Sequence, residues 1–225
     1  MIFREARWIA AALRDVPPDA LFPLLNVGSQ SEEFRKRTQP WIQREVFDPL
    51  QRRGLVIHLD LEAGPGVDIA GDLLDPRVIA QVQERGVRSV ICANVLEHVP
   101  DAKRFAGVLA SIVGRGGYLL VTGPRAFPWH PDPIDTMFRP TPQELAALFP
   151  GLTCEASAVV QSTLAAYLIR RFIESPRDFV RSTRRGGGSS TDFRSWLFRR
   201  ISATCALFRK PAAATAGMPP APLPE

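Results

Sequence analysis

Residues 89–101 read SVICANVLEHVPD, in which a short apolar run ends in polar residues just before a helical pattern begins. Similar apolar runs lie at residues 24–27, 56–61, 67–70 and 118–122. Short apolar runs without polar alternation are typical of strands covered on both faces, and strands that alternate with helices indicate a parallel sheet. The sequence therefore predicts an α/β fold with a doubly wound sheet and helices on both of its faces.

Helices are predicted between these runs over about residues 40–53, 76–84 and 101–113, and glycine follows the last two. The pattern changes after residue 122. A proline-rich loop at residues 123–142 is followed by a short helix at 142–148. Two late strands are predicted at residues 152–160 and 203–208.

Residues 161–200 differ in composition from the rest of the chain. Residues 161–210 hold 11 Lys and Arg against 3 Asp and Glu, an excess of positive charge larger than the net charge of +5 of the whole chain. Apolar residues recur at helical spacing on either side of the glycine-rich residues 184–190, which predicts two basic amphipathic helices. Their apolar positions are Leu164, Leu168, Phe172, Phe193, Trp196, Leu197 and Ile201. We interpret residues 1–210 as a single domain with an insertion at about 161–200, and the Pro- and Ala-rich residues 211–225 as a disordered tail.

The basic insertion is open to several interpretations. Arg-rich amphipathic helices with aromatic residues suit an anionic membrane surface or a lipid-linked substrate. They equally suit a partner or dimer face, or a solvated cover for the sheet. Nucleic acid is the least favoured partner, because residues 1–160 hold 17 Lys and Arg against 19 Asp and Glu and no nucleic-acid-binding motif is present.

The predicted location is the cytoplasm. No run of about 18 apolar residues occurs, and the first fifteen residues are interrupted by charges, so neither a spanning helix nor a signal peptide is expected. The three scattered cysteines, Cys92, Cys154 and Cys205, support neither a disulfide framework nor a zinc site. A peripheral position at the inner membrane surface is the alternative if the insertion binds lipid.

Polar residues follow each of the predicted parallel strands. Gly28 follows the first, Asp60 the second, Asp72 the third and Asn94 the fourth. The carboxyl ends of parallel strands meet at one edge of a sheet, where ligands bind in this class of fold. A carboxylate at Asp60 is placed to accept the hydroxyls of a ribose, and one at Asp72 can accept from an adenine amino group. The joint placement predicts a nucleotide-like ligand at this edge.

Four segments in this order, LLNVGSQ (24–30), VIHLDLEAGPGVDIAGDLLD (56–75), SVICANVLEHVPD (89–101) and GGYLLVTGP (116–124), resemble the class I S-adenosylmethionine-dependent methyltransferases. The likeness is to the bacterial small-molecule and glycan branch, which carries the NVLEHVPD signature. It covers about residues 20–160 and the last strand. It implies a Rossmann-like sheet of seven strands, the last of them antiparallel.

The resemblance implies that S-adenosylmethionine (SAM) is the cofactor and that residues following the strands hold it. The residues implied at the methionine end are Asn26, Gly28 and Ser29, and those at the ribose are Asp60 and Leu61. Asp72 and Leu73 are implied beside the adenine, and Asn94 and Val95 at the closing side of the pocket. No resident metal is expected.

Methyl transfer to a hydroxyl requires that donor and acceptor are aligned and that a proton is removed. His98 and His130 are the candidate bases, since both follow strands at the same edge; His98 can instead be a helix-start residue that contacts the cofactor. Asp132, Asp135 and Arg139 are the candidate substrate ligands, with a rigid turn as the structural alternative. A metal held by His130, Asp132 and Asp135 is a weaker alternative. His58 lies within a strand pattern and is expected to pack.

The predicted function is SAM-dependent O-methylation of a small molecule, a glycan or a lipid-linked saccharide. The sequence departs from the family at Gln30 and Glu32, where two further glycines usually stand. A side chain at Gln30 narrows the approach to the cofactor. The alternative is therefore a degenerate methyltransferase fold that serves as a binding or scaffold protein. An enzyme using another adenine nucleotide is disfavoured, because no G-x-G-x-x-G or Walker-type loop is present.

Overall fold

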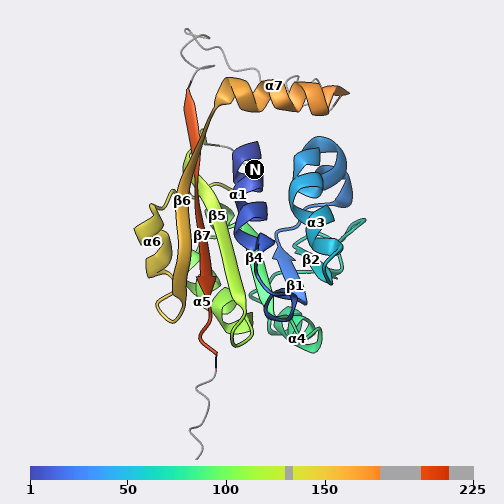
Figure 1. Ribbon diagram of the computed structural model, residues 1–225, viewed down its shortest axis with the longest axis vertical. Coiled ribbons are helices and arrows are strands. Elements are labelled where there is room, and N and C mark those ends of the chain that lie inside the picture. Colours follow the sequence, from blue (N-terminus) through green and yellow to red (C-terminus); the bar gives the residue numbers. More distant parts are fainter. Residues whose placement is uncertain (130–133, 178–198, 213–225) are drawn as a thin grey trace, which may run out of the picture.

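A seven-stranded mixed sheet forms the centre of the structure, a computed structural model that describes residues 1–129, 134–177 and 199–212 (Figure 1). The strand order is β3-β2-β1-β4-β5-β7-β6. The first five strands of this order are parallel, and β7 runs antiparallel to both of its neighbours. This confirms the predicted doubly wound α/β fold. The bounds are β1 (Leu24–Val27), β2 (Val56–Asp60), β3 (Ile69–Ala70), β4 (Ser89–Ala93), β5 (Tyr118–Ala126), β6 (Thr153–Thr163) and β7 (Arg200–Arg209).

Both faces of this sheet are covered. Alternate residues of the central strands enter opposite cores: Leu25 packs on one side and Leu24 on the other. Helices α4 (Pro76–Glu84), α5 (Ala102–Ile112) and α6 (Pro142–Ala147) cover the first face, and α1 (Phe3–Arg14) with the segment from 42 to 51 covers the second. Such double coverage explains why the strands read as uninterrupted apolar runs.

The remaining helical elements are short. The predicted helix at 40–53 is present as a π-helical turn, η2 (Ile42–Phe47), that continues into α3 (Asp48–Gln51). The other short elements are α2 (Pro18–Leu21), the π-helical turn η1 (Phe34–Thr38) and the 3₁₀ turn η3 (Leu96–His98). Helix α1 was not expected from the sequence pattern, and it brings the N-terminal residues to the carboxyl edge of the sheet.

The late strands are longer than the apolar runs predicted. Strands β6 and β7 pair from Thr153↔Arg209 to Thr163↔Arg200, because the polar residues after Val160 and before Ala203 continue the ladder. The excursion predicted at about 161–200 begins after Thr163 and ends before Arg200, and Ile201 lies in β7 rather than in the second predicted helix.

The first of the two predicted amphipathic helices is confirmed as α7 (Leu164–Glu174). Figure 1 shows it at the end of the β6–β7 pair, across the ends of α1 and the helical turns. Gln39 donates to the Tyr167 hydroxyl at 3.3 Å, and Arg170 stacks on the Phe3 ring at 3.6 Å from its centroid. The second predicted helix, up to residue 198, and the tail from residue 213 lie outside the described residues.

No helix within the described ranges is both long and apolar enough to cross a lipid bilayer.

His58 packs inside the fold, as expected from its strand pattern. It is 5% exposed in β2 and lies edge-on to the Phe47 ring, with ring centroids 5.1 Å apart. The Asn26 side-chain nitrogen lies 3.1 Å from His58 Nδ1. Burial, reinforced by the charge of Arg35, lowers the pKa of His58 to about 4, so the ring is neutral in the folded chain at pH 7.

We expect the free energy of unfolding to fall by about 3 kcal/mol as the pH drops from 6.5 to 4 through His58 alone. Over that window the unfolded chain binds a proton at this residue and the folded chain does not. Urea unfolding at pH 7 and pH 4.5, on the wild-type chain and on His58→Gln, isolates this contribution from that of the carboxylates. Equal losses in the two proteins would show that His58 does not set this pH dependence.

Candidate functional site

A cavity of about 420 Å³ lies at the carboxyl ends of β1 and β4. The turn after β1 and the segment after β4 form one side of it, α1 contributes a second wall, and α7 contributes Tyr167 and Arg171. Of the predicted site residues, the cavity is lined by Asn26, Gly28, Ser29, Asn94 and His98. The edge of the sheet predicted from the sequence therefore does hold a cavity large enough for a small ligand.

The turn after β1 requires glycine at its first position. Gly28 has a φ of +69°, and a Cβ there would lie 2.4 Å from Cγ2 of Val95. Val95 thus packs onto the bare backbone of this turn. Gln30 also has a positive φ, +55°, a conformation that favours glycine. The backbone at Gln30 is therefore left-handed, although this position does not hold the glycine that the resembling family usually has there.

A buried arginine holds this turn in place. The guanidinium of Arg35, 3% exposed, donates from Nη1 to the carbonyl oxygens of Ser29, at 3.0 Å, and of Gln30. Nη2 donates to the carbonyl of Gly66 at 2.8 Å, in the loop between β2 and β3. A single side chain therefore fixes two loops that border the candidate cofactor site.

The predicted ribose ligand, Asp60, lies against the same turn. Its Oδ2 accepts the backbone N–H of Gln30 at 2.6 Å, and Oδ1 has a long contact, 3.4 Å, with the N–H of Glu62. Asp72 is exposed, and its Oδ1 accepts the N–H of Leu74 at 2.8 Å. Both carboxylates stand outside the cavity, farther along the sheet edge.

The two leucines predicted beside these carboxylates differ in burial. Leu61 is 64% exposed, whereas Leu73 is 2% exposed and packs in the core with Val78. The side chain of Leu73 is therefore committed to the core, and a ligand at this position would meet backbone rather than the leucine side chain.

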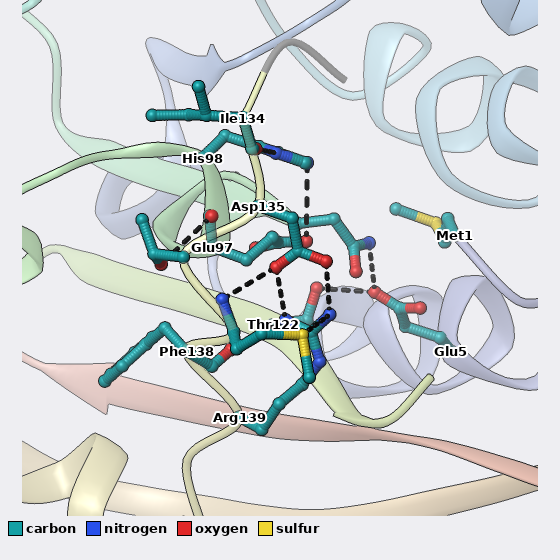
Figure 2. A network of polar contacts seen from close by, with 12 residues as sticks. Met1, Glu5, Glu97, His98, Thr122, Ile134, Asp135, Phe138 and Arg139 are labelled. Carbon is teal, nitrogen blue, oxygen red and sulfur yellow. Dashed lines mark hydrogen bonds and ion pairs between the residues drawn. The ribbon is translucent and has the colours of Figure 1, made fainter. Parts of the chain in front are cut away.

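Helix α1 adds a carboxylate that the sequence reading missed. Glu5 is 1% exposed, and its Oε1 accepts from Asn94 Nδ2 at 2.7 Å and from Thr122 Oγ1 at 2.6 Å (Figure 2). Its Oε2 accepts the N–H of Ile2 at 3.1 Å. One signal was present: Glu5 interrupts the apolar stripe of α1, between Ile2 and Ile9. An acidic residue on a buried helix face indicates a polar partner inside the fold.

Glu97 and His98 follow β4 and face each other. Glu97 Oε1 lies 3.8 Å from His98 Nε2, and His98 Nδ1 lies 2.5 Å from the carbonyl oxygen of Ile134 (Figure 2). A carbonyl only accepts, so Nδ1 carries the proton and Nε2 is the acceptor nitrogen of the neutral ring. Burial, together with the nearby charge of Glu5, raises the pKa of Glu97 to about 8.

The two predicted substrate ligands within the described residues pair with each other. Arg139 donates from Nη1 and Nη2 to the two oxygens of Asp135, at 3.0 and 2.6 Å, and the Asp135 side chain is fully buried (Figure 2). Thr136 donates its N–H to the carbonyl of Glu97 at 2.9 Å. The ion pair thus shapes the segment that contacts His98. His130 and Asp132 lie outside the described residues.

Comparison with known proteins identifies the fold. No family model and no curated protein sequence matches the chain. A candidate methyltransferase from Bacillus halodurans C-125, BH2331, superposes with a TM-score of 0.51 at 14% identity, over 90% of this chain and 99% of that one. The fold is that of a Rossmann-like methyltransferase. A SAM-dependent methyltransferase from Archaeoglobus fulgidus and N-methyltransferase NodS from Bradyrhizobium japonicum WM9 align less well, with TM-scores of 0.47 and 0.42, each at 13% identity over 92% of this chain and 96% of theirs.

At these identities the likeness concerns the fold alone. Within this methyltransferase fold, the glycine turn, the Asp60 carboxylate and the cavity beside Asn94 occupy one edge of the sheet. In the part of the chain that the structure describes, no three His, Cys, Asp or Glu side chains gather closely enough to hold a metal ion.

Proposed function

We propose that this chain is a SAM-dependent methyltransferase that acts on a hydroxyl group of a small molecule, a glycan or a lipid-linked saccharide. One observation carries the proposal: a cavity of about 420 Å³ lies between the glycine turn after β1 and the Glu97–His98 pair after β4. In an open α/β sheet this is the edge where ligands bind. A methyltransferase fold with a cavity at that edge, lined by both apolar and polar side chains, favours catalysis over a purely structural role.

The residues of the sheet edge fit the cofactor. Among the described residues, Asp60 Oδ1 has a single long contact, with the N–H of Glu62, so this oxygen retains the capacity to accept a ribose hydroxyl. Gly28 and Ser29 border the cavity where the methionine end would lie, and Asp72 lies farther out, on the side of the adenine. When bound, SAM supplies a methyl group activated on a sulfonium. The protein's own task is to hold, orient and deprotonate the acceptor.

His98 is the proposed general base. Its Nδ1 donates to the Ile134 carbonyl, so Nε2 is the nitrogen that would take up the proton of the acceptor hydroxyl. His98 also lines the cavity, so an acceptor hydroxyl inside it comes within reach of the ring. His130 remains a predicted second base, and Asp132 a predicted substrate ligand.

The surface of α7 supports a proposed peripheral contact with a membrane or with a second copy. Ile169 and Ile173 are 58% and 70% exposed, and Arg170 lies on the same helix. An apolar stripe beside basic residues is typical of a helix at an anionic interface. We propose a cytoplasmic protein with this peripheral contact and without a nucleic-acid partner.

Binding of SAM and of S-adenosylhomocysteine, measured by titration calorimetry, tests the proposed function. We expect wild-type protein to bind both ligands and Asp60→Ala to bind them about 10- to 100-fold more weakly, because one or two charge-assisted hydrogen bonds to the ribose are lost. Asp60→Asn keeps an acceptor for the Gln30 N–H and tests the charge alone.

Glu62→Ala is the matched control, since Glu62 is an exposed carboxylate two residues away. It is expected to bind like wild type. Unchanged affinity in Asp60→Ala would remove the ribose assignment. Absence of binding by wild-type protein at millimolar ligand would favour the scaffold alternative, in which the side chain of Gln30 obstructs the turn.

A further inference from the structure

Glu97, which lines the cavity, has a carboxyl oxygen without a hydrogen-bond partner among the described residues. Glu97 is 1% exposed, and among the described residues no donor reaches its Oε2, which is fully buried. Its Oε1 lies 3.8 Å from His98 Nε2, which is beyond hydrogen-bond distance. Unsatisfied buried polar groups are rare in native proteins, and an ionised one is costly. Because Glu97 lines the cavity, a charged ligand there would act on this carboxyl through a low-dielectric surrounding.

The cations near Glu97 have other hydrogen-bond partners, and the first of them, the amino group of Met1, donates to Gln39 Oε1 at 3.2 Å. Glu5 is a second carboxyl in the same wall and is itself satisfied by three donors. The positive charge of Arg139 favours the ionised form of Glu97, but the Arg139 guanidinium forms a bidentate ion pair with Asp135 (Figure 2). The charged and titratable groups that face Glu97 are, element by element, Glu5 of α1, the amino group of Met1, Cys92 of β4, His98 of η3, and Asp135 with Arg139 of the segment after residue 134.

These surroundings determine the protonation of Glu97. Because burial and Glu5 raise its pKa to about 8, the carboxyl is mostly protonated at pH 7. A positive charge that enters the cavity would favour the ionised form and release the proton. A neutral ligand of similar shape would leave the carboxyl protonated.

We propose that Glu97 is the residue by which the cavity distinguishes a positively charged cofactor from its neutral product. Its carboxyl ionises against the sulfonium of SAM and is protonated when S-adenosylhomocysteine, a neutral thioether, is bound instead. This inference rests on the proposed function, because the sulfonium is the cation that this function brings into the cavity. Glu97 is thus a specificity-determining residue for the charge of the ligand.

The test is a proton count. Titration calorimetry at pH 7, in buffers that differ in ionisation enthalpy, gives the number of protons released as each ligand binds. We expect wild-type protein to release about one proton more with SAM than with S-adenosylhomocysteine, and Glu97→Gln to show no such difference. Comparison with the variant also cancels protons exchanged by the amino groups of the two ligands. Glu84→Gln, an exposed carboxylate on α4, should behave like wild type.

The same linkage predicts a pH dependence that needs no variant. In wild-type protein the ratio of SAM affinity to S-adenosylhomocysteine affinity should rise about tenfold from pH 7 to pH 9, as Glu97 becomes ionised before binding. The rise keeps the test decisive if Glu97→Gln does not fold. A flat ratio would overturn the inference.

The remaining outcomes separate the inference from the proposed function. Proton release that persists in His98→Ala supports Glu97 as its source, whereas loss in that variant assigns the proton to His98 and overturns the inference. Binding of both ligands with equal proton counts overturns the inference and leaves the proposed function standing. Failure of wild-type protein to bind either ligand overturns both, because no sulfonium enters the cavity.

Discussion

Replacement of Arg35 with alanine is expected to reduce the free energy of unfolding by about 3 to 5 kcal/mol and to abolish measurable SAM binding. Three carbonyl oxygens, those of Ser29, Gln30 and Gly66, lose a charged donor, and a hydrogen bond to a charged group contributes about 1.5 to 3 kcal/mol without full additivity. The turn after β1 and the loop after β2 would then lose the side chain that bridges them, although the N–H of Glu32 still donates to the carbonyl of Pro65 at 2.9 Å. Urea unfolding and calorimetric titration with SAM measure the two losses.

Arg35→Lys separates charge from geometry. An ammonium is a point charge, so it cannot bridge three carbonyls as the planar guanidinium does, and we expect most of both losses to persist. Lys36→Ala is the matched control, because the neighbouring Lys36 is exposed and pairs only with Glu32 at the surface, a contact worth less than about 1 kcal/mol. If Arg35→Ala has the stability and the SAM affinity of the wild-type protein, the turn after β1 does not depend on the Arg35 side chain.

Asp135→Asn is expected to cost a similar amount, about 3 to 5 kcal/mol, because it leaves the buried guanidinium of Arg139 without its counter-ion. The same carboxylate accepts the N–H of Met137, which has a φ of +59° and therefore depends on local support. Urea unfolding measures the loss. The contact of His98 with Ile134 lies on this segment, so the His98 ring resonances should shift as well.

The double variant Asp135→Leu/Arg139→Met tests the reason for that loss. Replacement of a buried ion pair by apolar residues of similar size is often neutral, so the double variant should recover most of the stability lost in Asp135→Asn. If it is as unstable as the single variant, the pair contributes through its hydrogen bonds to the backbone rather than through charge balance. If Asp135→Asn is as stable as wild type, the ion pair is dispensable.

The sheet could be predicted from the sequence because its signals are local. Each parallel strand is a short apolar run, and each run ends where a polar residue begins, as at Asp60 and Asn94. The late strands were predicted too short, since the residues near Thr163 and Arg200 are polar and join the ladder only because they pair with each other. Cross-strand pairing of this kind leaves no periodic apolar pattern.

The candidate site could be predicted only in part, for a similar reason. Gly28 and Asn94 follow strands, so their place at the cavity was predictable. Glu5 and Arg35 act across long distances in sequence: Glu5 meets Thr122, and Arg35 meets Gly66. The pairing of Asp135 with Arg139 was equally hidden, because both residues suit a substrate site and a buried ion pair alike.

The junction of β6 and β7 gives the sheet a single attachment point for a large excursion. Thr163 pairs with Arg200, and the N–H of Leu164 donates to the carbonyl of Arg199 at 3.0 Å, so the excursion leaves and returns at one place. The entropy of closing such a loop changes slowly with its length. Segments of other lengths can therefore be grafted here without a change in strand register. Since Tyr167 and Arg171 come from this excursion, a graft would exchange one wall of the cavity and leave the turn after β1 and the segment after β4 in place.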